Sequence, residues 1–229
     1  MGFERAGEET KTMGKKVLVM TAVDAEREAV LRGLDGDARF EVALAGVGPA
    51  MAAARTAAKL AGGDYGLVVS AGIGGGFIGT APVGSLVVAS EIVAADLGTE
   101  TPSGFLPLDE LGFGSARAKP DKALADKLAR AIEGAGLPVR LGPVLTVCTV
   151  TGTADSAAAR ARRTPGAAAE GMEGYGVAVA AGERGLPVLE FRAISNPVGP
   201  RDRAAWKIPQ ALKALEAACA LLPEVLGNA

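Results

Sequence analysis

Two hydrophobic patterns alternate along the chain, short apolar runs and longer segments with helical spacing. Apolar runs of strand length occur at residues 17–22, 40–46, 65–70 and 186–194; the first leads into an amphipathic stretch, the second into an Ala-rich one and the third into glycines. A continuous apolar run is typical of a strand that is buried on both faces of a largely parallel sheet. Strands that alternate with helices over the whole length predict an α/β fold.

The same patterns place the remaining elements. Further strands are expected within residues 139–150 and 167–172, and residues 84–96 suggest two strands or one long bent strand. Helices are expected at residues 25–34, 49–60, 122–132, 156–163 and 174–185. A final helix is expected to place four side chains on one face, Leu212, Leu215, Cys219 and Leu222. Residues 97–119 are rich in Gly, Pro and Asp, lack periodicity and predict a long loop.

These elements predict a three-layer α/β/α sandwich with a central mixed, largely parallel sheet. A chain of 229 residues is long enough to bury a substantial core, and no linker-like stretch divides it. We therefore expect one domain over residues 15–229, preceded by a flexible lead at residues 1–14. Ligands of such sheets bind beyond the carboxyl ends of the strands, so candidate residues are sought there.

Composition narrows the class of protein. Hydrophobic residues make up 49% of the chain and charged residues 22%, with a net charge of -2, so a basic surface for nucleic acid is not expected. No apolar run approaches the ~18 residues that span a bilayer, which argues against membrane insertion. The polar N-terminus lacks the apolar region of a secretory signal, so a cytoplasmic location is expected.

The chain contains no histidine, which rules out a Ser-His-Asp or Cys-His mechanism and a metal site that includes histidine. Proton transfer must then use carboxylates, Lys, Tyr or water, and neither a metal nor an organic cofactor is expected. Cys148 and Cys219 both lie in apolar contexts, which predicts two buried side chains without a disulfide.

The run SAGIGGG, residues 70–76, follows a buried strand with little side-chain bulk. At Gly72, Ile73 and Gly74 the backbone N–H groups could therefore approach a ligand closely. A tight turn before a hairpin is the structural alternative. A dinucleotide-binding fingerprint is disfavoured, because the residues after the run do not open a helix.

Two further strand ends carry polar side chains. In GMEG, residues 171–174, Glu173 lies between a strand and a helix, where a carboxylate could also simply favour the helix dipole. The segment AISNPVGPRDRAAW, residues 193–206, follows another buried strand. Its Trp beside two Arg could form the floor for an aromatic or anionic ligand, although Asp202 could instead cap the last helix and the Arg side chains could be solvated. The candidates in this segment are Asn196, Arg201, Asp202, Arg203 and Trp206.

Taken together, these segments resemble the nucleosidase branch of the purine nucleoside phosphorylase superfamily. The similarity is strongest to hydrolases of menaquinone biosynthesis, whose substrate carries a 6-oxopurine at one end and an aryl carboxylate at the other. The matching stretches lie between about residues 16 and 210, and their order and spacing are more specific than any one of them. They are TAVDAEREAV, AGVGPAMAAA, SAGIGGGF, VGSLVVASEIVAADLGTETPSGFLPLDELGFG, AEGMEGYGVA and FRAISNPVGPRDRAAW.

The resemblance implies a role for each matching residue. Glu26 would position and activate the attacking water, and Asn196 would hydrogen-bond the purine and support protonation at N7. Glu173 would hold the ribose hydroxyls and Met172 would pack against the sugar, while the backbone around Val150 and Thr151 would line the base pocket. Glycosidic cleavage has an oxocarbenium-like transition state, which gains from a nearby carboxylate and a stabilised leaving group.

The sequence departs from the wider superfamily at three positions. Nucleosidases that recognise methylthioadenosine carry Asp in the purine position and Ser within the glycine motif, where this chain has Asn196 and Ile73. Phosphorylases carry an Arg that holds phosphate just before the glycine motif, where this chain has Ser70. Hydrolysis is therefore favoured over phosphorolysis.

The resemblance also implies the partners, which are a small nucleoside substrate and water. Relatives form homodimers or higher assemblies, so the same is expected here. The alternatives are another nucleosidase or phosphorylase of the superfamily, of inosine or methylthioadenosine type, and a non-catalytic nucleoside-binding protein.

Overall fold

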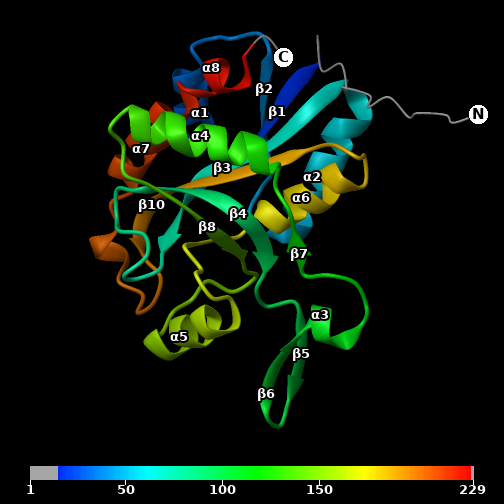
Figure 1. The fold of residues 1–229 in the computed structure, drawn as a ribbon, viewed down its shortest axis with the longest axis vertical. Helices are drawn as coiled ribbons and strands as arrows, with labels where there is room; N and C mark the ends of the chain where they lie inside the picture. The colour runs from blue at the N-terminus through cyan, green and yellow to red at the C-terminus, as the bar shows by residue number, and fades with distance from the viewer. Residues whose placement is uncertain (1–14, 228–229) are drawn as a thin grey trace, which may run out of the picture.

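The computed structural model describes residues 15–227, so the lead predicted for residues 1–14 lies outside the described residues. Strands and helices alternate along most of the described chain (Figure 1). The strands are β1 (Lys16–Thr21), β2 (Phe40–Leu44), β3 (Tyr65–Gly76), β4 (Leu86–Ala94), β5 (Gly98–Thr101), β6 (Gly104–Pro107), β7 (Arg117–Ala118), β8 (Val139–Thr146), β9 (Ala169–Gly171) and β10 (Val188–Pro197). The helices are α1 (Asp24–Leu34), α2 (Pro49–Gly62), α3 (Leu108–Leu111), α4 (Lys122–Gly134), α5 (Ala154–Arg163), α6 (Gly174–Gly182), the 3-10 helix η1 (Arg203–Ala205), α7 (Ile208–Cys219) and α8 (Leu222–Leu226).

Eight strands form one mixed sheet in the order β10-β4-β8-β9-β3-β1-β2, with β7 paired to β4. Parallel pairing joins β1 to β2 and β3, β10 to β3, and β8 to β4 and β9. Because β10 also pairs antiparallel with β4, five strands close into a ring. The α/β fold with a mixed sheet is confirmed, whereas the predicted sandwich did not include this ring.

Helices pack on both faces of the sheet, and the alternation within β1 shows why. Val17 and Val19 belong to one buried cluster with side chains of α1, α4, α7 and α8. Leu18 and Met20 belong to another with side chains of α2 and α6. Successive side chains of a strand point to opposite faces, so a strand that is apolar at every position needs a helical layer on each side. Figure 1 shows α4 and α8 on one side and α2 and α6 on the other.

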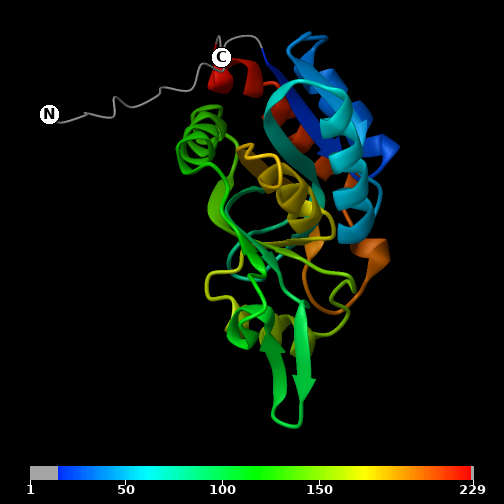
Figure 2. The ribbon, with the colours of Figure 1, turned by 90° about the vertical axis from the view of Figure 1, so that its right-hand side faces the viewer.

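The long loop predicted for residues 97–119 was wrong. In its place, β5 and β6 pair as an antiparallel hairpin, which is followed by α3 and by the two-residue strand β7. Pro102 and Ser103 form the turn of the hairpin, and Gly104, which follows them, has a φ of 118° that suits glycine. Strands of four residues are too short to show a clear period, which is why the pattern did not reveal them. Figure 2 shows the hairpin extending away from the sheet.

Two other expectations need correction. The final helix is divided, because α7 ends at Cys219 and α8 begins at Leu222, with Pro223 in the first turn of α8, where proline is tolerated. Cys219 is buried as expected, but Cys148 is exposed, because it follows the end of β8 at the rim of the sheet. None of the helices formed by residues 15–227 has the length and apolar character needed to cross a membrane.

Candidate active site

A cavity of about 290 Å³ lies at the carboxyl ends of β1, β3 and β10. Ligands of α/β sheets commonly bind at this edge. Its walls come from segments that are far apart in the sequence. The predicted site residues that line it are Glu26, Ile73, Gly74, Val150, Thr151, Met172, Glu173, Asn196, Arg201 and Trp206. Gly72, Asp202 and Arg203 are predicted site residues that are not part of this lining.

Glu26 lies in the first turn of α1 and is only 3% exposed. Its Oε2 accepts hydrogen bonds from the backbone N–H of Ala22 at 2.8 Å and of Val23 at 3.3 Å. Its Oε1 accepts from the N–H of Ile73 at 2.8 Å. Burial raises the pKa of Glu26, and the nearby charge of Arg192 opposes that rise. The result is a fixed carboxylate at the cavity wall that takes up a proton more readily than an exposed glutamate.

Glu173 immediately precedes α6 and is 6% exposed. Its Oε2 lies 3.4 Å from Nη1 of Arg192 and accepts from the N–H of Met172 at 3.2 Å. Its Oε1 accepts from the N–H of Gly48 at 3.4 Å. The guanidinium and two backbone N–H groups thus hold the side chain beside the cavity. A carboxylate that only interacted with the helix dipole would not need these contacts.

Sequence reasoning missed two residues next to these carboxylates, Glu190 and Arg192 of β10. Arg192 is 1% exposed, and its Nε donates to Oε1 of Glu190 at 2.9 Å. Its Nη2 donates to Oγ of Ser70 at 2.9 Å. The available signal was the pattern LEFRA, in which two charged residues interrupt a strand that is otherwise apolar.

Glycines of the two motifs SAGIGGG and GMEG make room for the buried ion pair of Glu190 and Arg192. A Cβ at Gly72 would lie 2.6 Å from Nη1 of Arg192 and 2.7 Å from Oε1 of Glu26. A Cβ at Gly174 would lie 2.1 Å from Oε2 of Glu190. The glycine run lies within β3 rather than forming a turn, and the N–H of Ile73 is used by Glu26. The backbone of the glycine run therefore lies close to the side chains of Glu26 and Arg192.

Asn196 lies near the end of β10 and lines the cavity. Its Oδ1 accepts from Oγ of Ser195 at 2.8 Å, and its Nδ2 donates to the carbonyl of Pro197 at 3.0 Å. Each amide group keeps capacity for another hydrogen bond, since the oxygen has a second lone pair and the nitrogen a second hydrogen. Asn196 can therefore offer one donor and one acceptor to a ligand.

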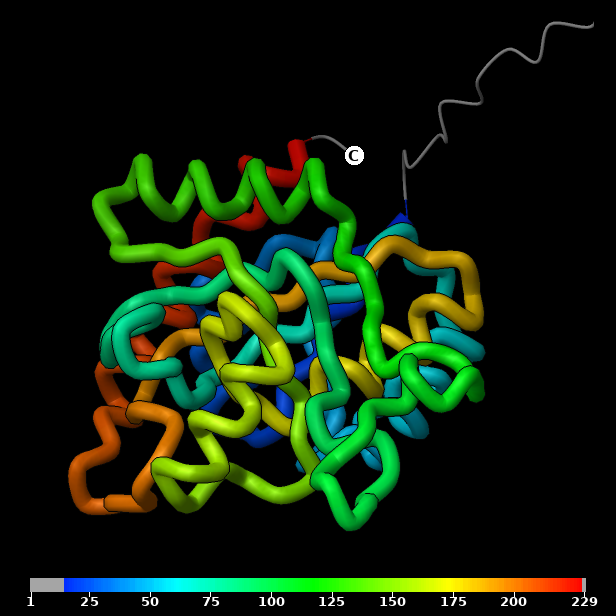
Figure 3. Tube along the Cα trace, turned by 60° about the horizontal axis from the view of Figure 1, so that its bottom comes forward, coloured from blue at the N-terminus to red at the C-terminus, as the bar shows by residue number. Residues whose placement is uncertain are grey.

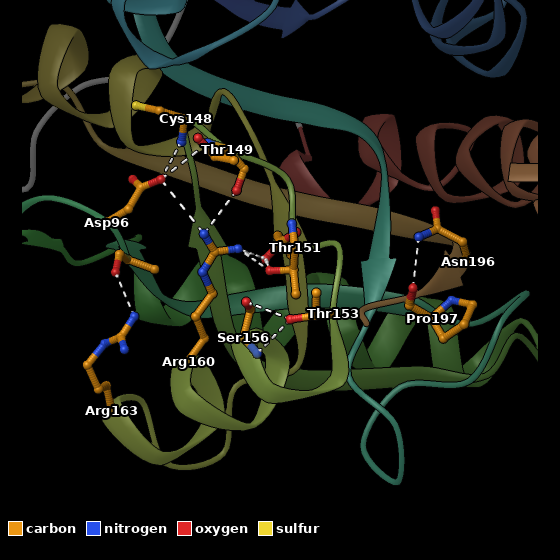
Figure 4. A network of polar contacts seen from close by, with 12 residues as sticks. Asp96, Cys148, Thr149, Thr151, Thr153, Ser156, Arg160, Arg163, Asn196 and Pro197 are labelled. Atoms are coloured by element: carbon orange, nitrogen blue, oxygen red, sulfur yellow. Dashed lines mark hydrogen bonds and ion pairs between the residues drawn. The ribbon is translucent and has the colours of Figure 1, made fainter. Parts of the chain in front are cut away.

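The loop after β8 is held in place by a second network of polar contacts, buried at Glu170 and exposed at Cys148, which the sequence did not reveal (Figure 4). Glu170 accepts from the N–H of Thr151 at 2.9 Å and forms an ion pair of 2.8 Å with Arg160 of α5. Nη2 of Arg160 donates to the carbonyl of Thr149 at 2.9 Å, and Asp96 accepts from the N–H of Cys148 at 2.7 Å. These contacts position the backbone that forms one side of the cavity.

The segment 195–207, orange in Figure 3, supplies further residues of the cavity lining. The guanidinium carbon of Arg201 lies 5.7 Å from the centroid of the Trp206 ring, and both residues line the cavity. Asp202 accepts from the N–H of Ala204 at 3.2 Å and caps η1. It therefore caps a helix, as the alternative to a ligand-binding role expected, but that helix is η1 and not the last helix of the chain. Arg203 is exposed and lies outside the lining.

The comparisons with known proteins agree with this fold. The family model of the phosphorylase superfamily matches residues 8–226. The chain therefore belongs to the phosphorylase superfamily.

Within that superfamily, the chain is similar to proteins named futalosine hydrolase. It is 53% identical to that of Streptomyces coelicolor, over 92% of this chain and 96% of the relative. It is 48% identical to that of Acidothermus cellulolyticus, over 92% and 91%. Among solved structures, a 5'-methylthioadenosine/S-adenosylhomocysteine nucleosidase from Neisseria meningitidis shares the fold with a TM-score of 0.74. That pair is 21% identical and covers 90% of this chain and 98% of the other.

Proposed function

We propose that this protein hydrolyses the N-glycosidic bond of futalosine, releasing hypoxanthine and dehypoxanthine futalosine, as a step of menaquinone biosynthesis. The observation that carries the proposal is the pair of buried carboxylates, Glu26 and Glu173, at one cavity of a chain that is 53% identical to a futalosine hydrolase. A protein that only binds a nucleoside has no need for a buried carboxylate that can accept a proton, which argues against the non-catalytic alternative.

Glu26 acts as the general base in this proposal. Three backbone N–H groups hold its carboxylate, so that it can orient a water molecule toward the anomeric carbon of the ribose. The bond from that carbon to N9 of the purine breaks as the sugar gains oxocarbenium character. The water oxygen then bonds to the anomeric carbon and its proton passes to Glu26. The bond electrons leave with the purine, whose N7 takes a proton from solvent water, so that hypoxanthine leaves as a neutral base.

Glu173 and Met172 bind the sugar. A carboxylate can accept hydrogen bonds from two vicinal hydroxyls, and Glu173 is held at the cavity by Arg192 and two backbone N–H groups. Met172 lines the same wall and offers an apolar surface to the ribose. The two residues fix the sugar relative to Glu26, which contributes to catalysis through orientation.

Asn196 selects the base in this proposal. Its amide can donate to O6 of hypoxanthine while its oxygen accepts from the protonated N7. Val150 and Thr151 line the opposite side of the base, where the contacts of Glu170 hold their loop. A 6-oxopurine is therefore the base that fits best.

The aryl carboxylate at the far end of futalosine is received by Arg201 and Trp206. Both lie in the cavity lining, and Arg can bind a carboxylate with two hydrogen bonds while Trp packs against an aromatic ring. Arg203, the other candidate Arg of residues 193–206, is exposed. Arg201 is favoured because only it, of the two Arg in this segment, lines the cavity of the described chain.

Hydrolysis is favoured over phosphorolysis by the contacts of Ser70. Its hydroxyl is 1% exposed and accepts from Arg192, so it lies within the ion cluster rather than facing a phosphate. A bound phosphate dianion needs charge-assisted donors. Arg192, which lies nearby, is already engaged with Glu173 and Glu190.

The proposal is tested by incubating the purified protein with futalosine, inosine or methylthioadenosine, each with and without phosphate, and measuring the free base by chromatography. We expect hypoxanthine from futalosine without phosphate. Release that requires phosphate would show a phosphorylase, and preference for inosine or methylthioadenosine would favour another activity of the superfamily. Binding of futalosine without cleavage would show a binding protein.

The proposal includes a homodimer or higher homo-oligomer that acts in the cytoplasm. Sedimentation of the purified protein at several concentrations tests the oligomeric state, and a monomer at all of them would contradict it.

A further inference from the structure

Glu190 is a buried carboxyl group that the proposed reaction leaves without a role. It is separated from Arg192 by one residue of β10, so both side chains point to the same face of the strand. Glu190 is 0% exposed and does not line the cavity. A fully buried ionisable side chain is costly unless it is paired, so its presence calls for a physical reason.

The position of Glu190 determines how Arg192 is oriented. Glu190 engages Nε at 2.9 Å and Ser70 engages Nη2 at 2.9 Å, which fixes two edges of the planar guanidinium. Nη1 is then directed to Glu173, whose Oε2 lies 3.4 Å away. The space that a Cβ of Gly72 would fill is bordered by Nη1 and by Oε1 of Glu26, so the same nitrogen also faces Glu26.

The charges of this cluster do not balance if every carboxyl is ionised. Glu26, Glu173 and Glu190 are each at most 6% exposed, and the guanidinium of Arg192 is the cation that contacts this group in the described chain. Full ionisation would leave two uncompensated negative charges in a region shielded from water. An unpaired buried ion is costly, so at least one carboxyl keeps its proton, which reduces the excess negative charge to one.

The hydrogen bonds indicate which carboxyl holds the proton. Glu26 accepts from three backbone N–H groups, and Glu173 accepts from two as well as from Arg192. Glu190 accepts from Nε of Arg192, while its Oε2 is buried with no hydrogen-bond partner among residues 15–227. Burial raises the pKa of Glu190, Arg192 opposes the rise and Glu173 adds to it.

We propose that Glu190 is a positioning residue that stays protonated in the working enzyme, orienting Arg192 by a hydrogen bond while leaving the guanidinium charge to Glu173 and Glu26. A neutral acid can still accept from Nε through its carbonyl oxygen. The groups that face it are Arg192 on its own strand and Glu173 before α6, with Glu26 of α1 beyond the guanidinium. One cation then serves two catalytic carboxylates.

Two substitutions separate this role from a merely structural one. Glu190→Gln keeps the shape, the neutral charge and an oxygen that can accept from Arg192. We expect it to retain kcat on futalosine within about twofold and the same acid limb of the kcat/KM profile. Glu190→Leu removes the anchor, so the guanidinium can turn toward Glu26 and favour its anionic form. We expect kcat to fall about tenfold or more and the acid limb to move about one pH unit lower.

The protonation state has a readout that needs no substrate. Infrared spectroscopy of the intact protein near neutral pH should show the carbonyl stretch of a protonated, water-shielded carboxyl. Glu190→Gln should lack that band, and Glu26→Gln should keep it. The catalytic part rests on the proposed function, whereas the infrared part does not. A wild-type protein that fails to cleave futalosine would therefore refute the proposed function alone.

Three results would overturn the inference. The first is the absence of the band in the wild type. The second is a Gln variant whose acid limb moves to lower pH, since that shows an ionised Glu190 in the wild type. The third is a Leu variant with wild-type kcat and pH profile and only a lower Tm. If Glu190→Leu does not fold, the infrared comparison and the Gln profile still decide between a neutral and an ionised side chain.

Discussion

The substitution Asn196→Asp tests base selection, and its effect can be worked out from the contacts of the amide. In the wild type, Oδ1 accepts from Oγ of Ser195 at 2.8 Å and Nδ2 donates to the carbonyl of Pro197 at 3.0 Å. An ionised Asp keeps the first bond but places a second oxygen against the carbonyl. Because the bond to the carbonyl of Pro197 is exposed and water can replace it, its loss should destabilise the fold by only about 0.5–1.5 kcal/mol.

The same change acts on the substrate. The Asp oxygen would face O6 of hypoxanthine, again oxygen to oxygen, whereas it could accept from both N7–H and the 6-amino group of an adenine. A buried mismatch of this kind costs about 1–3 kcal/mol, which is roughly one to two powers of ten in kcat/KM. We expect futalosine cleavage to fall by this factor while the relative rate on its 6-amino counterpart rises.

The assay measures kcat/KM for both substrates under identical conditions, with urea unfolding to record the stability loss separately. Asn196→Ala is the matched control, since it removes the donor and the acceptor without adding charge and should reduce both rates together. If Asn196→Asp keeps the wild-type ratio between the two substrates, Asn196 does not select the base. Backbone groups near Thr151 and the side chain of Asp202 would then be tested instead.

Three further predictions concern the base, the rim and the glycine motif. Glu26→Gln should lower kcat by about 100-fold or more and remove the acid limb, which lies above the range of an ordinary glutamate because the pKa of Glu26 is raised; turnover with an unchanged pH profile would contradict this. Because a raised folded-state pKa makes stability fall as pH rises through that window, the Tm of the wild type should fall relative to that of the variant as the pH rises, although the Gln amide faces a backbone N–H and costs stability at every pH; a Tm difference that does not change with pH would contradict this. Arg201→Ala should raise KM for futalosine about tenfold or more with little effect on inosine, whereas Arg203→Ala should leave both unchanged; equal losses on both substrates would indicate a structural role. Gly174→Ala should lower the free energy of unfolding in urea by about 1–3 kcal/mol, because the added Cβ would lie 2.1 Å from a carboxylate oxygen of Glu190. Gly182→Ala is the control and should be tolerated, since its Cβ would meet nothing within 4 Å in the described chain; equal effects of the two substitutions would contradict the steric explanation.

The sequence alone was sufficient to predict an α/β fold with a mixed sheet and about half of the residues that line the cavity. Apolar runs such as residues 65–70 must be buried on two faces, which requires helices on both sides of a sheet. Parallel strands bring their carboxyl ends to one edge, so Glu26, Glu173 and Asn196 could be expected to meet although they are far apart in the chain. The structure places all three around one cavity. Their roles in the reaction stay predictions.

The tertiary structure alone decided which charged groups face each other. Periodicity shows that Glu190 and Arg192 share one face of a strand, but not that Ser70 and Glu173 meet them there. Such partners come from neighbouring strands and loops, and their register depends on pairings across the whole sheet. Long-range pairing also closes five strands into a ring and brings Glu170 to the loop after β8. Local pattern determines what is buried, whereas long-range pairing determines what it is buried against.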